Sequence, residues 1–159
     1  WEPLDQSSRG LDAEISGSLT DRWQVYAGYT FNRSTNRNSV GDNVESRRKG
    51  YNFSSHTPKH MFRLYTSYIL PVDDGKWTVG LGLKSSSKTA NSYGSIKQGG
   101  YTIWNTNVQY RPSKNLQLGL AVNNLTDKRY YENQYSRAAN SGSFYGEPRN
   151  AVFSLKWKM

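Results

Sequence analysis

The chain has 159 residues, of which 35% are hydrophobic, 14% aromatic and 21% charged, and its formal net charge is +9. The aromatic content is too high for a disordered segment, and the excess of uncharged polar residues argues against a helical bundle. No apolar run is long enough for a transmembrane helix, and the first residues lack the basic and apolar regions of a signal peptide. Cysteine is absent, which excludes disulfides, cysteine-ligated metals and a thiol nucleophile.

Seven segments of the chain alternate apolar and polar residues with a period of two. In chain order they lie at about 11–19, 23–32, 62–70, 77–84, 104–111, 116–123 and 150–159. This periodicity predicts seven β-strands of roughly nine to eleven residues, each with one apolar and one polar face. No helical stretch of useful length is found.

The connections between these segments alternate in length. Three are short and carry turn residues, at 20–22, 71–76 and 112–115, and three are long, at about 34–59, 85–99 and 126–147. Short turns on one side and long loops on the other are typical of a bacterial outer-membrane barrel, whose strands alternate apolar-out and polar-in. The chain is therefore predicted to be all-β, an antiparallel transmembrane β-barrel in the bacterial outer membrane, rather than a soluble β-sandwich.

Aromatic residues lie near the ends of the apolar strand faces. They predict a lipid-facing girdle formed by Trp23, Phe31, Trp77, Tyr110 and Trp157. A soluble sandwich has no reason to place tryptophan repeatedly at strand ends. The same alternation predicts that Trp23, Val25, Leu64, Leu81, Leu118 and Phe153 face lipid, and that Asp12, Glu14, Gln24, Asn105 and Gln117 face the lumen.

The odd number of strands leaves two membrane alternatives, because complete single-chain bacterial barrels have an even number. Either the chain is the C-terminal third of a 22-stranded barrel of roughly 500 residues, or one strand escapes the pattern and the chain is a complete eight-stranded adhesin or lipopolysaccharide binder. A soluble nucleic-acid-binding β-barrel is suggested by the isoelectric point of about 9.8. It is disfavoured because the strand aromatics mostly lie on the uncharged face.

Five stretches of the chain carry a family resemblance. They are Ser8-Arg9-Gly10-Leu11-Asp12-Ala13-Glu14 after Trp1-Glu2-Pro3, Gly28-Tyr29-Thr30-Phe31, Thr57-Pro58-Lys59-His60, Asn123-Asn124-Leu125-Thr126-Asp127-Lys128-Arg129-Tyr130-Tyr131, and Phe144-Tyr145-Gly146-Glu147-Pro148-Arg149-Asn150. Together they resemble the TonB-dependent outer-membrane receptors of the ferric-siderophore type, most of all the hydroxamate-siderophore receptors. The fourth stretch is the most specific, and it resembles the signature before the last extracellular loop. The family usually ends in Phe or Trp, whereas this chain ends in Met159.

The resemblance implies that residues 1–159 form a single barrel segment, the last seven strands of 22, without the N-terminal plug domain. It implies a receptor and transporter for ferric siderophore uptake, not an enzyme. No cofactor is implied, because the siderophore carries the iron. The implied partners are the ferric siderophore, the TonB energy-coupling complex through the missing N-terminal region, and lipopolysaccharide with outer-membrane lipid. Nucleic acid is not an expected partner.

Two sets of loop residues are candidates for ligand binding. The long loops hold ten Lys or Arg against five Asp or Glu, including the run Arg47-Arg48-Lys49, and this excess suits anionic lipopolysaccharide or an anionic iron chelate. The aromatic and basic candidates are Tyr51, Phe53, Tyr93, Arg129, Tyr130, Tyr131, Tyr135, Arg137, Phe144 and Tyr145. For each of them the alternative is packing of the loops on one another or a solvated surface.

The sequence contains no catalytic constellation. His56 and His60 straddle the end of a loop and the start of a strand, so they share no helical face and no metal site is expected. Nothing resembles a nucleophile elbow or a glycine-rich phosphate loop before a helix. No catalytic or metal-ligating residue is therefore predicted.

Overall fold

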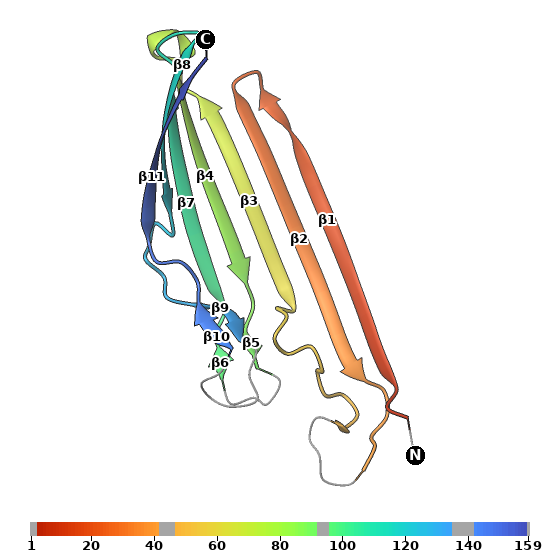
Figure 1. Cartoon of the computed structure of the whole chain (residues 1–159). Helices are drawn as coiled ribbons and strands as arrows, with labels where there is room; N and C mark the ends of the chain where they lie inside the picture. Colours follow the sequence, from red (N-terminus) through yellow and green to blue (C-terminus); the bar gives the residue numbers. More distant parts are fainter. Residues whose placement is uncertain (1–2, 42–46, 92–95, 135–141, 159) are drawn as a thin grey trace.

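Seven long strands form one antiparallel sheet in chain order in the computed structural model, which describes residues 3–41, 47–91, 96–134 and 142–158. The strands are β1 (Gln6–Thr20), β2 (Trp23–Asn36), β3 (His60–Ile69), β4 (Trp77–Ser86), β7 (Tyr101–Tyr110), β8 (Leu116–Asn123) and β11 (Asn150–Trp157) (Figure 1). The all-β antiparallel prediction and the number of main strands are confirmed. Among the described residues, no helix has the length and apolar character needed to cross a membrane.

The short and long connections lie at opposite ends of the sheet, as Figure 1 shows. One short turn contains a single 3-10 turn, η2 (Asp73–Gly75). The long connections contain two small hairpins that the sequence pattern did not predict. These are β5 (Thr89–Ala90) with β6 (Lys97–Gln98), and β9 (Tyr131–Gln134) with β10 (Ser143–Tyr145).

The first hairpin is longer than predicted. β1 has 15 residues and β2 has 14, and β2 runs to Asn36, although the first long loop was expected to begin at about residue 34. Beyond Phe31 the outward positions of this hairpin are polar, so the period-two signal ends while the backbone pairing continues from Asn32 to Asn36. Hydrogen bonding extends this hairpin past the apolar band.

The strand register places the alternating apolar residues predicted from the sequence on one face of the sheet. Residues opposite each other in an antiparallel pair share a face. One row runs across the sheet through Trp23, Tyr68, Val79, Val108, Leu120 and Phe153. The adjacent row on the other face runs through Gln24, Ser67, Gly80, Asn107 and Ala121. The predicted apolar and polar sets therefore lie on opposite faces.

No part of the chain that the structure describes packs against the apolar face. Ile103 is the one buried hydrophobic residue among those described, whereas Ile15 is 72% and Phe153 is 67% exposed. A soluble sandwich would cover such a face with a second sheet. An extended apolar face that stays exposed suits lipid contact instead.

The predicted girdle residues lie on this apolar face. Trp77 and Tyr110 stack at the short-turn end with ring centroids 4.3 Å apart, and Trp23 meets Tyr68 edge-to-face at 6.3 Å. Trp157 belongs to the same end, because it pairs with Leu116 beside a short turn. Phe31 lies at the loop-side end of the same face, so the five residues mark two levels of the sheet.

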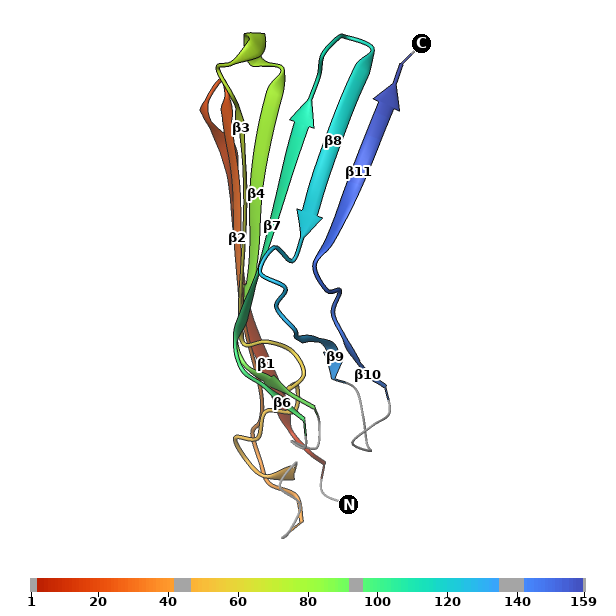
Figure 2. The same ribbon diagram turned by 90° about the vertical axis from the view of Figure 1, so that its left-hand side faces the viewer.

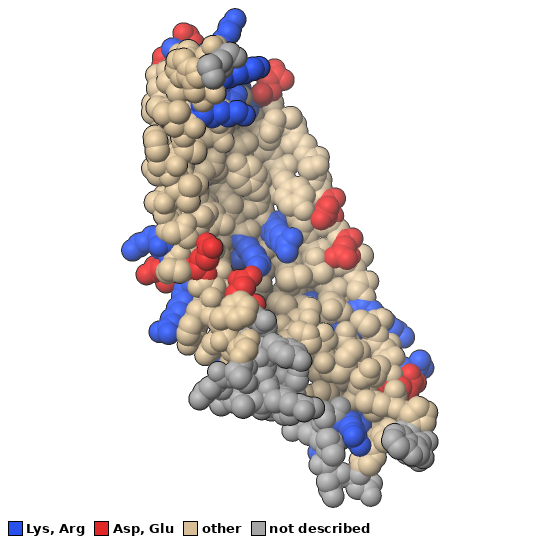
Figure 3. All heavy atoms as spheres, viewed as in Figure 1, with Lys and Arg blue, Asp and Glu red and all other residues tan. Residues whose placement is uncertain are grey.

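The sheet is curved and open at both edges. Figure 2 shows β1 to β4 overlapping in the side view while β8 and β11 turn away from them. β1 and β11 each pair with a single neighbour in this sheet. Figure 3 shows charged side chains gathered at the short-turn end and over the loop-side half, with a largely uncharged zone between them. These features match a section of a barrel wall.

The orientation can be tested with single cysteines, because the chain contains none. Leu118→Cys should react with a probe dissolved in lipid, and its neighbour Gln117→Cys should react with a water-soluble probe. Leu81→Cys and Asn105→Cys provide a second matched pair on other strands. Lipid-phase labelling of Gln117→Cys and Asn105→Cys would contradict the assignment of the two faces.

Candidate functional site

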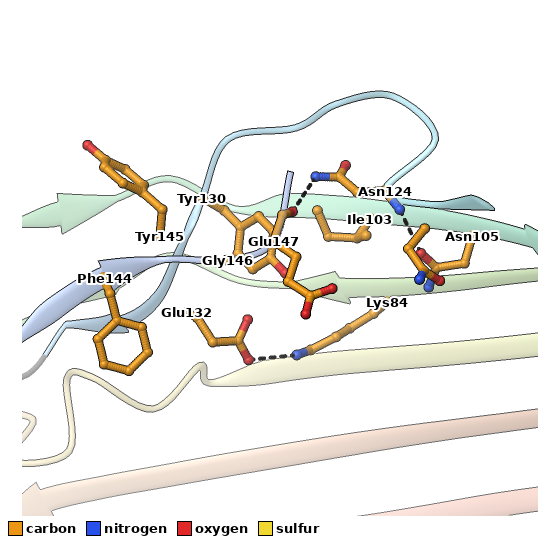
Figure 4. A pocket seen from close by; sticks show the side chains of 11 residues that line it. Lys84, Ile103, Asn105, Asn124, Tyr130, Glu132, Phe144, Tyr145, Gly146 and Glu147 are labelled. Carbon is orange, nitrogen blue, oxygen red and sulfur yellow. Dashed lines mark hydrogen bonds and ion pairs between the residues drawn. The ribbon is translucent and has the colours of Figure 1, made fainter. Parts of the chain in front are cut away.

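A hollow of about 560 Å³ opens on the polar face, at the loop-side end of the sheet (Figure 4). Its floor comes from the strands, through Lys84 on β4, Ile103 and Asn105 on β7, and Asn123 on β8. The last long loop forms the wall of the hollow and contributes Tyr130, Glu132, Phe144, Tyr145 and Glu147. The hollow therefore lies between strands β4, β7 and β8 and the two segments of this loop, the one that leaves β8 and the one that leads into β11.

The last loop is attached to the sheet through Asn124, which is 2% exposed and has a left-handed φ of 49°. Its Nδ2 donates to the carbonyls of Lys128 at 2.9 Å and Glu147 at 3.0 Å, and its Oδ1 accepts the Lys128 N–H at 2.8 Å. Its own N–H donates to Oδ1 of Asn105 at 2.9 Å. Asparagine adopts this backbone conformation more readily than most residues. The Asn124 side chain thus links the segment that leaves β8 to the segment that leads into β11.

Asp127 provides a second attachment. Its backbone N–H donates to the Asn124 carbonyl at 2.8 Å, and its φ is 52°. Its Oδ1 accepts the N–H of Arg149 at 2.9 Å, just before β11 begins. Asn123 donates to Asn150 Oδ1 at 3.0 Å across the same junction. The stretch with the most specific family resemblance therefore holds the two ends of the last loop together.

Tyr130 is held in the wall of the hollow by a close fit. Its ring stacks on Tyr101 at 4.7 Å, and its carbonyl accepts the N–H of Gly146 at 2.9 Å. A Cβ at position 146 would overlap the Tyr130 ring, so glycine is required for this approach. Burial, with a contribution from the nearby Glu132 carboxylate, raises the pKa of Tyr130 to about 12. Its phenol therefore stays neutral near pH 7.

Tyr131 and Tyr145 form a second aromatic pair in the same loop. Their rings stack at 4.5 Å, and their hydroxyl oxygens lie 3.2 Å apart. The guanidinium carbon of Arg129 lies 4.1 Å from the centre of the Tyr145 ring. The Arg129 guanidinium therefore lies against the aromatic rings, and no ion pair of the described residues includes it.

A smaller hollow of about 240 Å³ adjoins the first and shares Lys84 and Glu132 with it. Lys84 Nζ lies 3.9 Å from Glu132 Oε1, so strand and loop meet through opposite charges (Figure 4). Gln134 and Ser86 line the smaller hollow and are each 4% exposed, and their side-chain polar atoms have no hydrogen-bond partner among the described residues. Buried groups of this kind are available to water or to a polar ligand.

The structure brings together five of the predicted ligand-binding residues, all in the last loop: Arg129, Tyr130, Tyr131, Phe144 and Tyr145. Tyr51 and Phe53 line neither hollow, and the Tyr51 carbonyl accepts the Asn36 N–H at 3.0 Å at the far end of β2. Tyr93, Tyr135, Arg137 and the terminal Met159 lie outside the described residues.

Several lining residues were not predicted from the sequence. Lys84, Glu132, Gln134 and Glu147 belong to this group. Lys84 lies on the polar face of its strand, near the end that leads into a long loop. This position in the sequence could have marked it as a candidate lining residue. His56 lines the smaller hollow, whereas His60 bonds Tyr29 through Nδ1 at 2.8 Å. Within the described ranges, no three His, Asp or Glu side chains gather as a metal site would require.

The attachment of the last loop can be tested with Asn124→Ala. The change leaves the Lys128 N–H and two carbonyls without their partner, at a cost of about 1–3 kcal/mol per buried group. Amide hydrogen exchange should accelerate at residues 128–131, 146, 147 and 149. Asn115→Ala, in an exposed short turn, is the matched control and should leave that exchange unchanged. Equal exchange in both variants would contradict the attachment role.

Residues 4–125 match the family model described as TonB dependent receptor-like, beta-barrel. The chain is 33% identical over 153 residues to the ferric-pyoverdine M114 receptor PbuA of Pseudomonas sp. strain M114, covering 94% of this chain and 18% of that protein. It is 31% identical over 167 residues to the ferripyoverdine receptor of Pseudomonas aeruginosa PAO1, covering 99% of this chain and 18% of that receptor.

A solved structure shows the same architecture. The pyoverdine outer membrane receptor FpvA from P. aeruginosa PAO1, bound to pyoverdine, superimposes with a TM-score of 0.77 at 30% identity, over 97% of this chain and 22% of that one. The chain thus spans about a fifth of the length of the relatives it matches. Since the family model covers most of the sequence and the sheet has the form of a barrel wall, the chain belongs to the TonB-dependent receptor family and forms a stretch of its outer-membrane β-barrel.

Proposed function

We propose that the receptor containing this chain imports a ferric siderophore, and that the hollow beneath the last loop receives part of the chelate. The carrying observation is the convergence of Tyr130, Phe144 and Tyr145 with Lys84 and Glu132 on the polar face. Aromatic walls with a few polar groups suit an organic ligand. The relatives named as ferric-pyoverdine receptors support the same conclusion.

The proposal assigns the iron to the siderophore, with no metal ligand or cofactor from this chain. Loop aromatics would pack on the organic shell, while Arg129 and Lys84 would offset negative charge on the chelate. Energy would come from the TonB complex and act on a plug domain, both through regions outside this chain. The hydroxamate subclass stays a prediction, since the relatives include receptors named for pyoverdine and for catecholate siderophores.

A complete eight-stranded adhesin is not supported by the comparisons. The family model and the relatives describe receptors, whose matched members are several times longer than this chain. Import by a receptor therefore remains the single proposed function, and catalysis is no part of it.

The ligand role can be tested by replacing hollow-lining aromatics in the full receptor. Tyr145→Ala and Phe144→Ala should each weaken siderophore binding by about 1–3 kcal/mol, which is the value of burying such a side chain. Gly146→Ala should also weaken binding, because it displaces the Tyr130 ring. Affinity is measured by fluorescence or calorimetry, and uptake with radioactive iron.

Two controls separate ligand contact from general damage. Gly99→Ala adds a methyl group where nothing lies within 4 Å, and Phe153→Ala removes a lipid-facing ring that is 67% exposed. Both should bind and transport like the parent. If the loop variants also match the parent, the last loop serves packing, and the ligand must bind elsewhere in the receptor.

The basic run Arg47-Arg48-Lys49 allows a kinetic test of charge attraction. All three residues are exposed in the first long connection, and the Lys49 N–H donates to Ser39 Oγ at 2.8 Å. Replacing the three with glutamine should slow siderophore capture more than it changes retention, and added salt should reduce the difference. An unchanged association rate at low salt would contradict steering by this run.

A further inference from the structure

Two arginines lie directly opposite each other on the outer face of the first hairpin. Arg9 on β1 pairs with Arg33 on β2, two positions beyond the pair Leu11 and Phe31. Because residues two apart on a strand share a face, both arginines lie on the apolar face rather than in the lumen.

This pair carries an electrostatic cost. Like charges directly opposite on neighbouring strands destabilise a sheet. The ion pairs of the described residues join Arg37 to Asp5, Lys76 to Asp73 and Lys84 to Glu132, and none of them includes Arg9 or Arg33. The acids on the same strand, Asp12 and Glu14, occupy the opposite face. An external anion would remove the repulsion.

A third cation reaches the same surface. Lys59 Nζ lies 5.7 Å from the centre of the Phe31 ring, which faces outward. Phe31 in turn packs on His60 with ring centroids 5.2 Å apart. Lys59 therefore extends along the outer wall beside the arginine pair.

The position of Arg9 and Arg33 along their strands indicates which layer of the membrane surrounds them. Phe31 belongs to the loop-side aromatic level, and two residues of strand place the arginines about 7 Å beyond it. That is the level of lipid headgroups outside an aromatic girdle. Towards the membrane centre the same face offers Leu11, 58% exposed, and Ile15, 72% exposed. Cations above an open apolar wall match a lipid with anionic headgroup and several acyl chains.

We propose that Arg9, Arg33 and Lys59 bind a phosphorylated, multi-acyl glycolipid of the outer leaflet, of the lipid A type. The two guanidinium groups hold a phosphate between the strands, because arginine donates paired hydrogen bonds to phosphate oxygens. The acyl chains lie along Leu11 and Ile15. The site is on the outer wall, away from the hollow beneath the last loop, so its failure would leave the proposed import function untouched.

Arg33→Glu separates binding from stability, because the new carboxylate pairs with Arg9 and removes the repulsion in the sheet. Its thermal stability should equal or exceed that of the parent receptor. Retention of bisphosphorylated lipid A, measured by native mass spectrometry of the detergent-purified full receptor, should fall at least about tenfold. Arg9→Gln with Arg33→Gln should lose the lipid to a similar degree.

The matched control is Arg22→Gln with Arg111→Gln, which removes the same charge at the short-turn end. This control should retain lipid A like the parent, and phosphatidylglycerol retention should change little in any variant. Dephosphorylated lipid A should bind the parent at least about tenfold more weakly, and inorganic phosphate alone should not bind detectably. Unchanged lipid A retention in Arg33→Glu, or equal loss of phosphatidylglycerol and lipid A, would overturn the proposal.

Discussion

The structure depends on the hydrogen bonding of the backbone, because lipid provides no partner for an N–H or a carbonyl group. Within a membrane each of these groups has to bond to a neighbouring strand. The continuous ladder from β1 to β11 meets this requirement inside the sheet. Once the ladder sets the register, the period of two decides which face each side chain occupies. The row from Trp23 to Phe153 is apolar from end to end for this reason.

The same register builds the candidate site on the polar face. Lys84, Asn105 and Asn123 lie on three different strands, yet strand pairing brings all three to the loop-side end of the polar face. The last loop then covers them, because Asn124 and Asp127 attach both of its segments to the ends of β8 and β11. Close packing of Tyr130 on Gly146 completes the wall. A rigid sheet with a loop attached at two points is a suitable support for a binding surface.

The two faces of this sheet would serve two different partners. The polar face combines aromatic rings with Lys84 and Arg129, in keeping with an anionic organic chelate. The outer face combines exposed apolar side chains with the opposed Arg9 and Arg33, in keeping with an anionic lipid. Basic side chains on the two faces thus contribute to the net charge of +9 at separate places on the sheet.

Sequence alone determined the strand positions and the face of each side chain in the membrane-spanning part. The reason is that alternation between the two faces is a relation between successive residues, so it can be read directly from the chain. It also selected Tyr130, Tyr131, Phe144 and Tyr145 as candidates for ligand contact, since aromatic residues are conspicuous in a polar loop. It did not determine the ends of β1 and β2, where both faces are polar and only cross-strand hydrogen bonds mark the strand. Only the tertiary structure decided that Glu132 meets Lys84, that Tyr51 and Phe53 lie apart from the hollow, and that Arg9 opposes Arg33. These relations join residues distant in the chain, and only the pairing of strands brings such residues into contact.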